Sequence, residues 1–172
     1  MAAVRTAHTV WNGNLMEGSG NTTLDSSGLG TFDVTWKART EQAGGKTSPE
    51  ELIAAAHSAC FSMAFSHALA GAGYTPEEVQ TKADVTFVPG TGITGSHLTM
   101  SARIPGISEE EFRRISEEAK TGCPVSGALS SIDITLDATL TAQAGKFPPR
   151  TVRLRTILSG TNHPVIRERP CT

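Results

Sequence analysis

Apolar residues are densest between Ser48 and Gly71, and this stretch predicts one long helix. They occupy most sides of a helical wheel rather than one stripe, as in a helix at the centre of a fold. Ser48 can cap free backbone N–H groups, Pro49 fits the first helical position, and Glu51 stands where a capping box has its carboxylate. The helix should be roughly 35 Å long, which leaves surface for a second subunit to cover.

Three segments before this helix alternate apolar and polar side chains and predict strands. Residues 5–11 and 18–24 flank an Asn-Gly-Asn turn and should form a hairpin. Residues 31–39 predict a third strand, which delivers Arg39 at its end. Residues 41–47 are polar and glycine-rich, so they predict a loop that leads into the long helix.

The segments after the long helix predict three strands and two helices. Residues 79–88, 97–104 and 132–140 predict strands. Residues 108–120 begin with a second capping box and predict a helix, and a short helix should follow over 123–129. The order β-β-β-α-β-β-α-α-β has no regular βαβ alternation, so it predicts an α+β fold with mainly antiparallel sheets.

Composition excludes several classes of protein. The 172 residues are 38% hydrophobic and 19% charged, and no apolar run reaches the ~18 residues of a membrane span. The first residues lack the apolar core of a signal peptide, so we expect a cytoplasmic protein.

Residues 1–143 are acidic and predict one domain without a nucleic-acid surface. Residues 144–172 form a basic tail whose only acidic residue is Glu168, and we interpret it as a solvated or vector-encoded appendage.

Three cysteines, Cys60, Cys123 and Cys171, are too few and too scattered for a disulfide framework. Cys60 lies among alanines at the middle of the long helix and could simply be a small buried residue. Cys123 precedes Pro124 at a predicted helix N-terminus, where backbone N–H groups favour a thiolate, although it could also be a buried cap. Any pairing between cysteines would therefore be redox-linked rather than structural.

Two segments carry a family resemblance. The stretch TSPEELIAAAHSACFSMAF at 47–65, together with GCPVSGAL at 122–129, resembles the OsmC/Ohr family of organic hydroperoxide reductases. The resemblance extends over about residues 5–142. Within it, the segment that carries His57 resembles the OsmC branch of the family. It implies an OsmC/Ohr-like fold, with antiparallel sheets around a long central helix, in an intertwined homodimer.

The resemblance also implies a chemistry. The protein would be a thiol peroxidase without metal, haem or another cofactor, reducing organic and some inorganic hydroperoxides in oxidative and osmotic stress. Cys60 would be the peroxidatic thiolate, and Cys123 would close a disulfide with it. Arg39 would activate the thiolate, and Glu50 would hold Arg39. An external dithiol or a lipoylated protein would be the reductant.

The spacing of these residues leaves one question open. Glu50 and Cys60 are ten residues apart, so on one helix they are separated by roughly 15 Å along its axis. Either Arg39 reaches across that gap, or a second subunit supplies part of each site.

Other interpretations use the same residues. The cysteines could sense oxidant without turnover, in a redox-responsive stress protein. His57 precedes Cys60 by three helical positions and could form the Cys/His pair of a hydrolase. Arg39 could be an ordinary surface arginine and Glu50 only a favourable acid in a first helical turn. The remaining histidines lack metal-ligand spacing.

Overall fold

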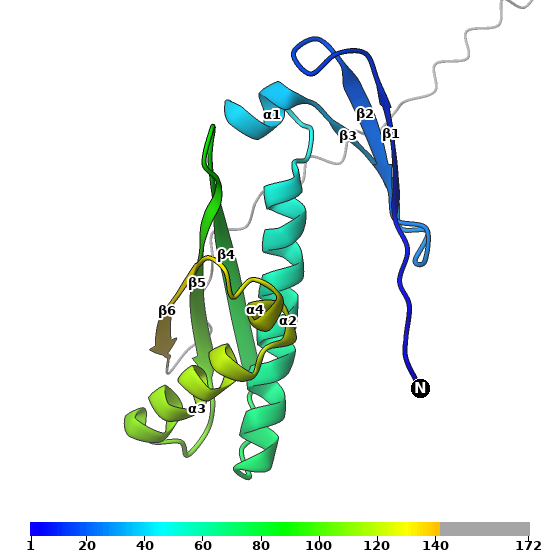
Figure 1. The fold of residues 1–172 in the computed structure, drawn as a ribbon. Coiled ribbons are helices and arrows are strands. Elements are labelled where there is room, and N and C mark those ends of the chain that lie inside the picture. Colours follow the sequence, from blue (N-terminus) through cyan, green and yellow to red (C-terminus); the bar gives the residue numbers. More distant parts are fainter. Residues whose placement is uncertain (142–172) are drawn as a thin grey trace, which may run out of the picture.

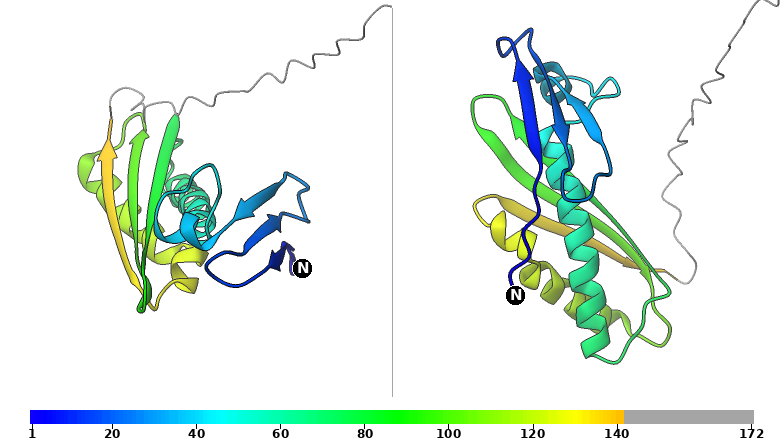
Figure 2. Two further views of the ribbon diagram at one scale, coloured as in Figure 1. Left: turned by 90° about the horizontal axis from the view of Figure 1, so that it is seen from above. Right: turned by 90° about the vertical axis from the view of Figure 1, so that its right-hand side faces the viewer.

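The computed structural model describes residues 1–141 (Figure 1). The elements, in chain order, are β1 (His8–Asn12), β2 (Ser19–Thr23), β3 (Thr31–Val34), α1 (Trp36–Thr40), α2 (Pro49–Gly71), β4 (Glu78–Val88), β5 (Gly92–Arg103), α3 (Glu109–Gly122), α4 (Pro124–Ala128) and β6 (Asp133–Leu140). The architecture is α+β, with two three-stranded sheets and a long helix between them (Figures 1 and 2). The expected boundary between residues 143 and 144, and the basic tail, lie outside the described residues.

Helix α2 begins and ends where the sequence predicts. The Ser48 hydroxyl accepts a hydrogen bond from the Glu51 amide, and Pro49 occupies the first helical position. The Glu51 carboxylate accepts a hydrogen bond from the Thr47 hydroxyl at 2.9 Å, so it fixes the residue before the cap. The chain leaves the helix at Gly73, whose φ of 84° suits a residue without a side chain.

The sheet of β4, β5 and β6 forms one side of the core. β4 pairs with β5 in antiparallel fashion, whereas β5 pairs with β6 in parallel. A parallel pairing needs a long connection, and α3 and α4 supply it. The two remaining pairings, within the sheet of β1, β2 and β3, are antiparallel, so the sheets are mainly antiparallel as predicted.

The hydrophobic core lies between one face of this sheet and helices α2 and α3. Ser108 caps α3 as expected, and the apolar side of α3 packs against α2. The buried apolar side chains come from α2, β5, the chain after β5, α3 and the turn into α4: Phe61, Phe65, Leu69, Leu98, Met100, Ala102, Ile104, Phe112, Ile115, Ala119 and Cys123. The core therefore fixes the middle of α2 against the start of α4.

The predicted strand over residues 31–39 is wrong in its second half. β3 ends at Val34, and Thr35 caps the short helix α1 by accepting a hydrogen bond from the Ala38 amide. The local cap replaces the extended backbone that the alternating pattern predicts, because threonine bonds readily to backbone two or three residues ahead. Arg39 consequently lies in a helical turn rather than at the end of a strand.

The sheet of β1, β2 and β3 stands apart from the rest of the molecule (Figures 1 and 2). Within the described part of the chain, a single backbone bridge, between Val34 and Thr47, connects a strand of this sheet to the chain just before α2. Large apolar side chains remain exposed on its strands and turns, among them Val10, Trp11 and Phe32. In the described part of the chain, this sheet therefore leaves apolar surface exposed to solvent.

Helix α2 is covered on one side only. Phe61, Phe65 and Leu69 are fully buried, but Met63 is 66% exposed. By length and composition this helix could cross a membrane, yet its buried face packs on β4 and α3 as the core helix of a globular domain does. The predicted central position is confirmed, and one face of the helix remains open.

Candidate active site

Two cysteines distant in the sequence meet at the centre of the fold. Cys60 lies at the middle of α2 and is partly exposed, whereas Cys123 caps the N-terminus of α4 and is only 1% exposed. Both are free thiols, and each shifts the pKa of the other. The backbone N–H of Val125 favours the ionised form of both thiols. The fold thus brings the predicted pair together.

The surroundings of the two thiols divide their acidities. Burial raises the pKa of Cys123, but hydrogen bonds from the Ser126 amide, the Cys60 thiol, the Ser126 hydroxyl and the Val125 amide outweigh burial and lower the pKa. Burial also raises the pKa of Cys60, and the hydrogen bond and negative charge at Cys123 add to that rise. Because the two thiols influence each other, they titrate as a pair.

An apolar pocket opens beside Cys60. It has a volume of about 470 Å³, and its lining includes Met63 and Ala64 on the same helix. Pro124, directly after Cys123, closes one side of it. His67 and Glu118 are polar groups at this pocket. A small molecule with an apolar body can therefore approach the Cys60 sulfur.

Arg39 and Glu50 form an ion pair at the beginning of α2. Both Nε and Nη2 of Arg39 donate to Glu50 Oε1, at 2.9 and 2.8 Å. The guanidinium carbon lies 4.0 Å from the centre of the Phe87 ring and 5.7 Å from that of Trp36, so two aromatic faces support it. Glu50 is 7% exposed, and its Oε2 atom has no hydrogen-bond partner among the described residues.

The structure does not bring this ion pair to the cysteines of the same chain. Arg39 and Glu50 line a groove between the first half of α2 and β4, whereas Cys60 lines the pocket beside α3. Because Arg39 is bound to Glu50, it does not span the roughly 15 Å of helix between Glu50 and Cys60. In this structure Arg39 therefore stays with Glu50 and does not reach Cys60 of the same chain.

His57 joins three elements in the buried interior. Its Nδ1 atom lies 2.7 Å from Ser96 Oγ on β5, and its Nε2 atom lies 2.9 Å from Ser126 Oγ on α4. Burial lowers the pKa of His57, so the ring is neutral at neutral pH. Both hydrogen-bond partners are hydroxyl groups, and among the described residues neither Cys60 nor a carboxylate bonds to this ring. That arrangement disfavours a Cys/His hydrolase.

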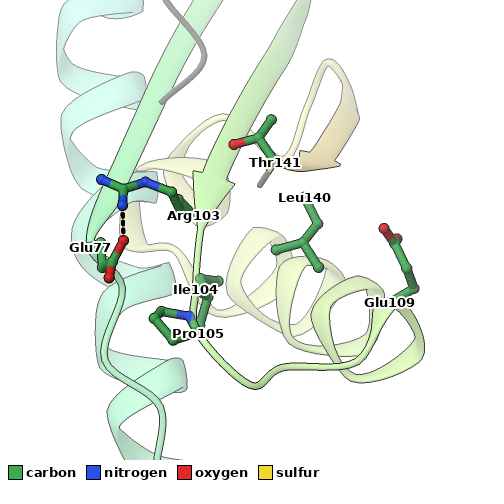
Figure 3. Close-up of a pocket in the computed structure, with 7 residues that line it drawn as sticks. All are labelled: Glu77, Arg103, Ile104, Pro105, Glu109, Leu140 and Thr141. Atoms are coloured by element: carbon green, nitrogen blue, oxygen red, sulfur yellow. Dashed lines mark hydrogen bonds and ion pairs between the residues drawn. The ribbon is translucent and has the colours of Figure 1, made fainter. Parts of the chain in front are cut away.

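A second arginine–glutamate pair provides a contrast. Arg103 bonds to Glu77 in a pocket of about 420 Å³ at the far end of β5 (Figure 3). The described residues that line it include no cysteine or histidine. Within residues 1–141, no group of three or more His, Cys, Asp or Glu residues is arranged to hold a metal ion. The cysteine pair remains the strongest candidate for chemistry.

Comparison with known proteins identifies the family. Residues 42–137 match the model of the OsmC-like protein family. The sequence is 42% identical over 130 residues to Peroxiredoxin OsmC of Escherichia coli K12. This match covers 74% of this chain and 90% of that protein. The chain belongs to the OsmC family.

Solved structures agree with this membership of the OsmC family. An organic hydroperoxide resistance protein from Elizabethkingia anophelis is 27% identical with a TM-score of 0.57, and the match covers 83% of this chain and all of that one. An OsmC-like protein from Mycoplasma pneumoniae has a TM-score of 0.63 at 17% identity, covering 82% of this chain and 99% of that one, which shows the shared fold. The predicted OsmC/Ohr-like fold is confirmed.

Some residues at this OsmC-family site were not anticipated from the sequence. Ser126, Val125 and Ser96 contact the cysteines or His57, and none was a candidate. A cap at Cys123 already places the next backbone N–H groups near its sulfur, so Val125 and Ser126 had a local signal. Ser96 had none, because its contact depends on the packing of β5 against α2.

Proposed function

We propose that Cys60 and Cys123 are the reacting pair of a cysteine-based peroxidase that reduces organic hydroperoxides. The observation that carries the proposal is the meeting of two free thiols that shift each other's pKa, one of which lines an apolar pocket. Relatives named a peroxiredoxin and an organic hydroperoxide resistance protein support the same activity. Defence against oxidative stress follows from that chemistry.

The proposed reaction has two steps within the protein. The Cys60 thiolate attacks one oxygen of the peroxide, the O–O bond breaks, and the departing alkoxide takes a proton to become the alcohol. Cys60 is then a sulfenic acid, and Cys123 attacks its sulfur to form a disulfide and water. An external dithiol, such as a lipoyl group, reduces the disulfide and is itself oxidised.

Cys60 must ionise before it can attack the peroxide. In the single chain the pKa of Cys60 is raised by burial and by Cys123, and the only arginine among the predicted site residues is bonded to Glu50 at the beginning of α2. An arginine beside the sulfur would favour the Cys60 thiolate and stabilise the departing alkoxide. We therefore assign Arg39 of a second copy to this position, with Glu50 of that copy holding its guanidinium.

Four features support a homodimer. The sheet of β1, β2 and β3 carries exposed apolar side chains, and α2 has an open face. The groove at Arg39 has a volume of about 830 Å³ and is lined by the small residues Ala54, Ala55 and Ser58, which let another chain approach closely. The buried Oε2 atom of Glu50 has no partner in the described chain, which is costly unless another group reaches it.

The remaining assignments follow the chemistry. The thiols need no metal or organic cofactor, because the dithiol reductant supplies both electrons in each turnover. A cytoplasmic location suits free thiols, which an oxidising compartment would convert to disulfides. Hydroperoxides with an apolar body should be preferred over hydrogen peroxide, because the pocket beside Cys60 is mostly apolar.

Single-turnover thiol loss tests this function. Reduced protein is mixed with tert-butyl hydroperoxide, the remaining thiols are trapped, and the linkages are mapped by mass spectrometry. We expect one Cys60–Cys123 disulfide per chain, absent in Cys60→Ser, and a steady rate of peroxide consumption when dithiol is added.

The outcomes separate the alternatives. Thiols that stay unreacted would contradict the peroxidase. A disulfide that forms without sustained turnover would indicate a sensor. A Cys/His hydrolase would instead survive Cys123→Ser and lose its activity in His57→Ala.

A further inference from the structure

Ser126 and His57 form a hydrogen-bonded chain behind Cys123. The Ser126 hydroxyl lies 2.9 Å from His57 Nε2, and Ser126 stands in the first turn of α4, directly after the Cys123 cap position, where its hydroxyl lowers the pKa of Cys123. On its other side, His57 Nδ1 lies 2.7 Å from the Ser96 hydroxyl. Ser126 is 5% exposed, Ser96 1% and His57 fully buried, so water does not compete for these bonds.

The donors and acceptors in this chain fit one arrangement when Cys123 is ionised. A thiolate only accepts, so the Ser126 hydroxyl donates to it. The Ser126 oxygen is then free to accept the Nε2 proton of His57, and a neutral ring with that proton accepts from the Ser96 hydroxyl at Nδ1. Every buried polar atom in the chain from Ser96 to Cys123 is satisfied in this arrangement.

We propose that His57 is a positioning residue for the resolving step: through Ser126 it holds a hydroxyl proton on the Cys123 thiolate and keeps Cys123 ready to attack oxidised Cys60. The inference rests on the proposed function and adds His57, Ser126 and Ser96 to its site. Neither His57 nor Ser96 touches the peroxide or the reacting sulfur atoms.

The step that this network assists is balanced without another reagent. The Cys123 thiolate uses an electron pair to form the S–S bond, and the S–O bond of the Cys60 sulfenic acid breaks. The proton that left Cys123 joins the departing hydroxide to give water. The sulfur of Cys60 is reduced, and the sulfur of Cys123 is oxidised.

Other titratable groups near the pair come from three elements of the described chain. From α2, Cys60 itself and His67 face the same pocket as Pro124. From α3, Glu118 lines that pocket, and Lys120 lines the one behind Ser126. β6 contributes only Ile134 to the pocket that Ser126 lines, and this side chain has no titratable group. A pH dependence of the resolving step must therefore be separated from titration of these groups, which the variants below leave intact.

The first test measures the acidity of Cys123 directly. In a Cys60→Ser, Cys171→Ser chain Cys123 is the remaining thiol, and its thiolate is followed by ultraviolet absorbance against pH. Ser126→Ala should raise the pKa of Cys123, because it removes the hydroxyl that would donate to the thiolate. His57→Leu should also raise it, because the Ser126 hydroxyl is then no longer held towards the thiolate. Ser116→Ala is the matched control, since it removes another buried serine hydroxyl, which bonds to the Phe112 carbonyl.

The second test follows the lifetime of the Cys60 sulfenic acid after a single turnover with peroxide. Near neutral pH, Ser126→Ala and His57→Leu should slow disulfide formation about tenfold, the loss expected for one hydrogen bond to a charged group. His57→Gln, which can still donate to Ser126, should stay within about threefold of the parent. The double variant Ser126→Ala, His57→Leu should be no slower than Ser126→Ala, because the two residues act through one proton.

The pH profile separates this role from simple packing. Slowing caused by a raised Cys123 pKa should disappear in alkaline solution, whereas damage to packing would slow the step at every pH. An unchanged pKa in Ser126→Ala would overturn the inference, as would additive effects in the double variant. If His57→Leu fails to fold, Ser126→Ala and His57→Gln still decide the question.

The two proposals fail in different ways. A parent protein in which Cys60 forms no sulfenic acid would overturn the proposed peroxidase. Normal sulfenic acid formation, together with a resolving rate that no variant changes, would overturn only the role of His57.

Discussion

At the scale of single residues, acidity at the site is set by hydrogen bonds rather than by nearby cations. Cys123 has its pKa lowered although it is buried, because two backbone N–H groups, the Ser126 hydroxyl and the Cys60 thiol favour its ionised form. Cys60 lacks most of these donors, and its pKa is raised. Under the proposed function, a positive charge from a second copy would favour ionisation of Cys60.

His57 gives a prediction about stability at the same scale. Burial lowers its pKa in the folded protein, while the unfolded imidazole takes up a proton below about pH 6.5. Acid therefore favours the unfolded state: this contribution to stability is complete above that pH and is lost as the pH falls towards the folded pKa. Urea unfolding of the parent should show a lower free energy of unfolding at mildly acidic than at neutral pH.

The matched variants identify the group. His57→Gln should reduce this slope with pH, whereas His67→Gln, which removes an exposed histidine from the same helix, should keep it. An equal slope in the parent and in His57→Gln would exclude His57 as the cause.

At the scale of elements, α2 is the scaffold on which the site depends. Its buried face packs on the sheet and on α3, and Phe65 is in contact with the aromatic rings of Phe61 and Phe112. The same helix carries Glu50, His57 and Cys60, so its position sets the relative placement of all three. Its open face is where we expect a second copy to pack.

Phe65 measures the contribution of that packing. Phe65→Ala should lower the free energy of unfolding by about 3–5 kcal/mol, because it removes a fully buried ring and leaves a cavity. Arg113→Ala on the exposed side of α3 should change it by less than about 0.5 kcal/mol. Denaturant unfolding compares the two, and a loss at Phe65 no larger than that at Arg113 would contradict this role of α2.

At the scale of the whole molecule, the single chain keeps the two cysteines apart from the ion pair of Arg39 and Glu50. The cysteines lie at the middle of α2, and Arg39 with Glu50 lies at its beginning. A two-fold symmetric dimer places the same two surfaces on each partner, so one contact would complete two sites. The exposed sheet of β1, β2 and β3 would then be covered rather than displayed to solvent.

Mixed subunits test this sharing. Cys60→Ser and Glu50→Ala are each expected to be inactive alone. In a heterodimer of the two, one site would combine an intact Cys60 with an intact Glu50 from the other chain, so peroxide consumption should reappear after unfolding and refolding the mixture.

A second mixture is the control. Cys60 and Cys123 meet within one chain, so Cys60→Ser mixed with Cys123→Ser should recover no turnover through a Cys60–Cys123 disulfide. Absence of recovery with Glu50→Ala, although heterodimers are detected by native mass spectrometry, would contradict sharing between chains.

The sequence by itself determined the features that depend on neighbouring residues. The caps at Ser48 and Ser108, the extent of α2, the hairpin of β1 and β2, and the strands of the larger sheet follow from periodicity and from hydrogen bonds between residues close in the chain. The early strand failed only where a threonine cap competed with an alternating pattern. The two cysteines and the Arg39–Glu50 pair were also candidates from the sequence.

Only the tertiary structure decided how these parts meet. His57 bonds to serines that are 39 and 69 residues away, β6 runs parallel to β5, and Arg39 stays with Glu50 instead of reaching Cys60. Such contacts depend on how α2, α4 and the sheet pack together, and no local pattern encodes a distance between segments so far apart. The acidity of the cysteines was likewise beyond the sequence, because it depends on burial and on donors that packing brings together.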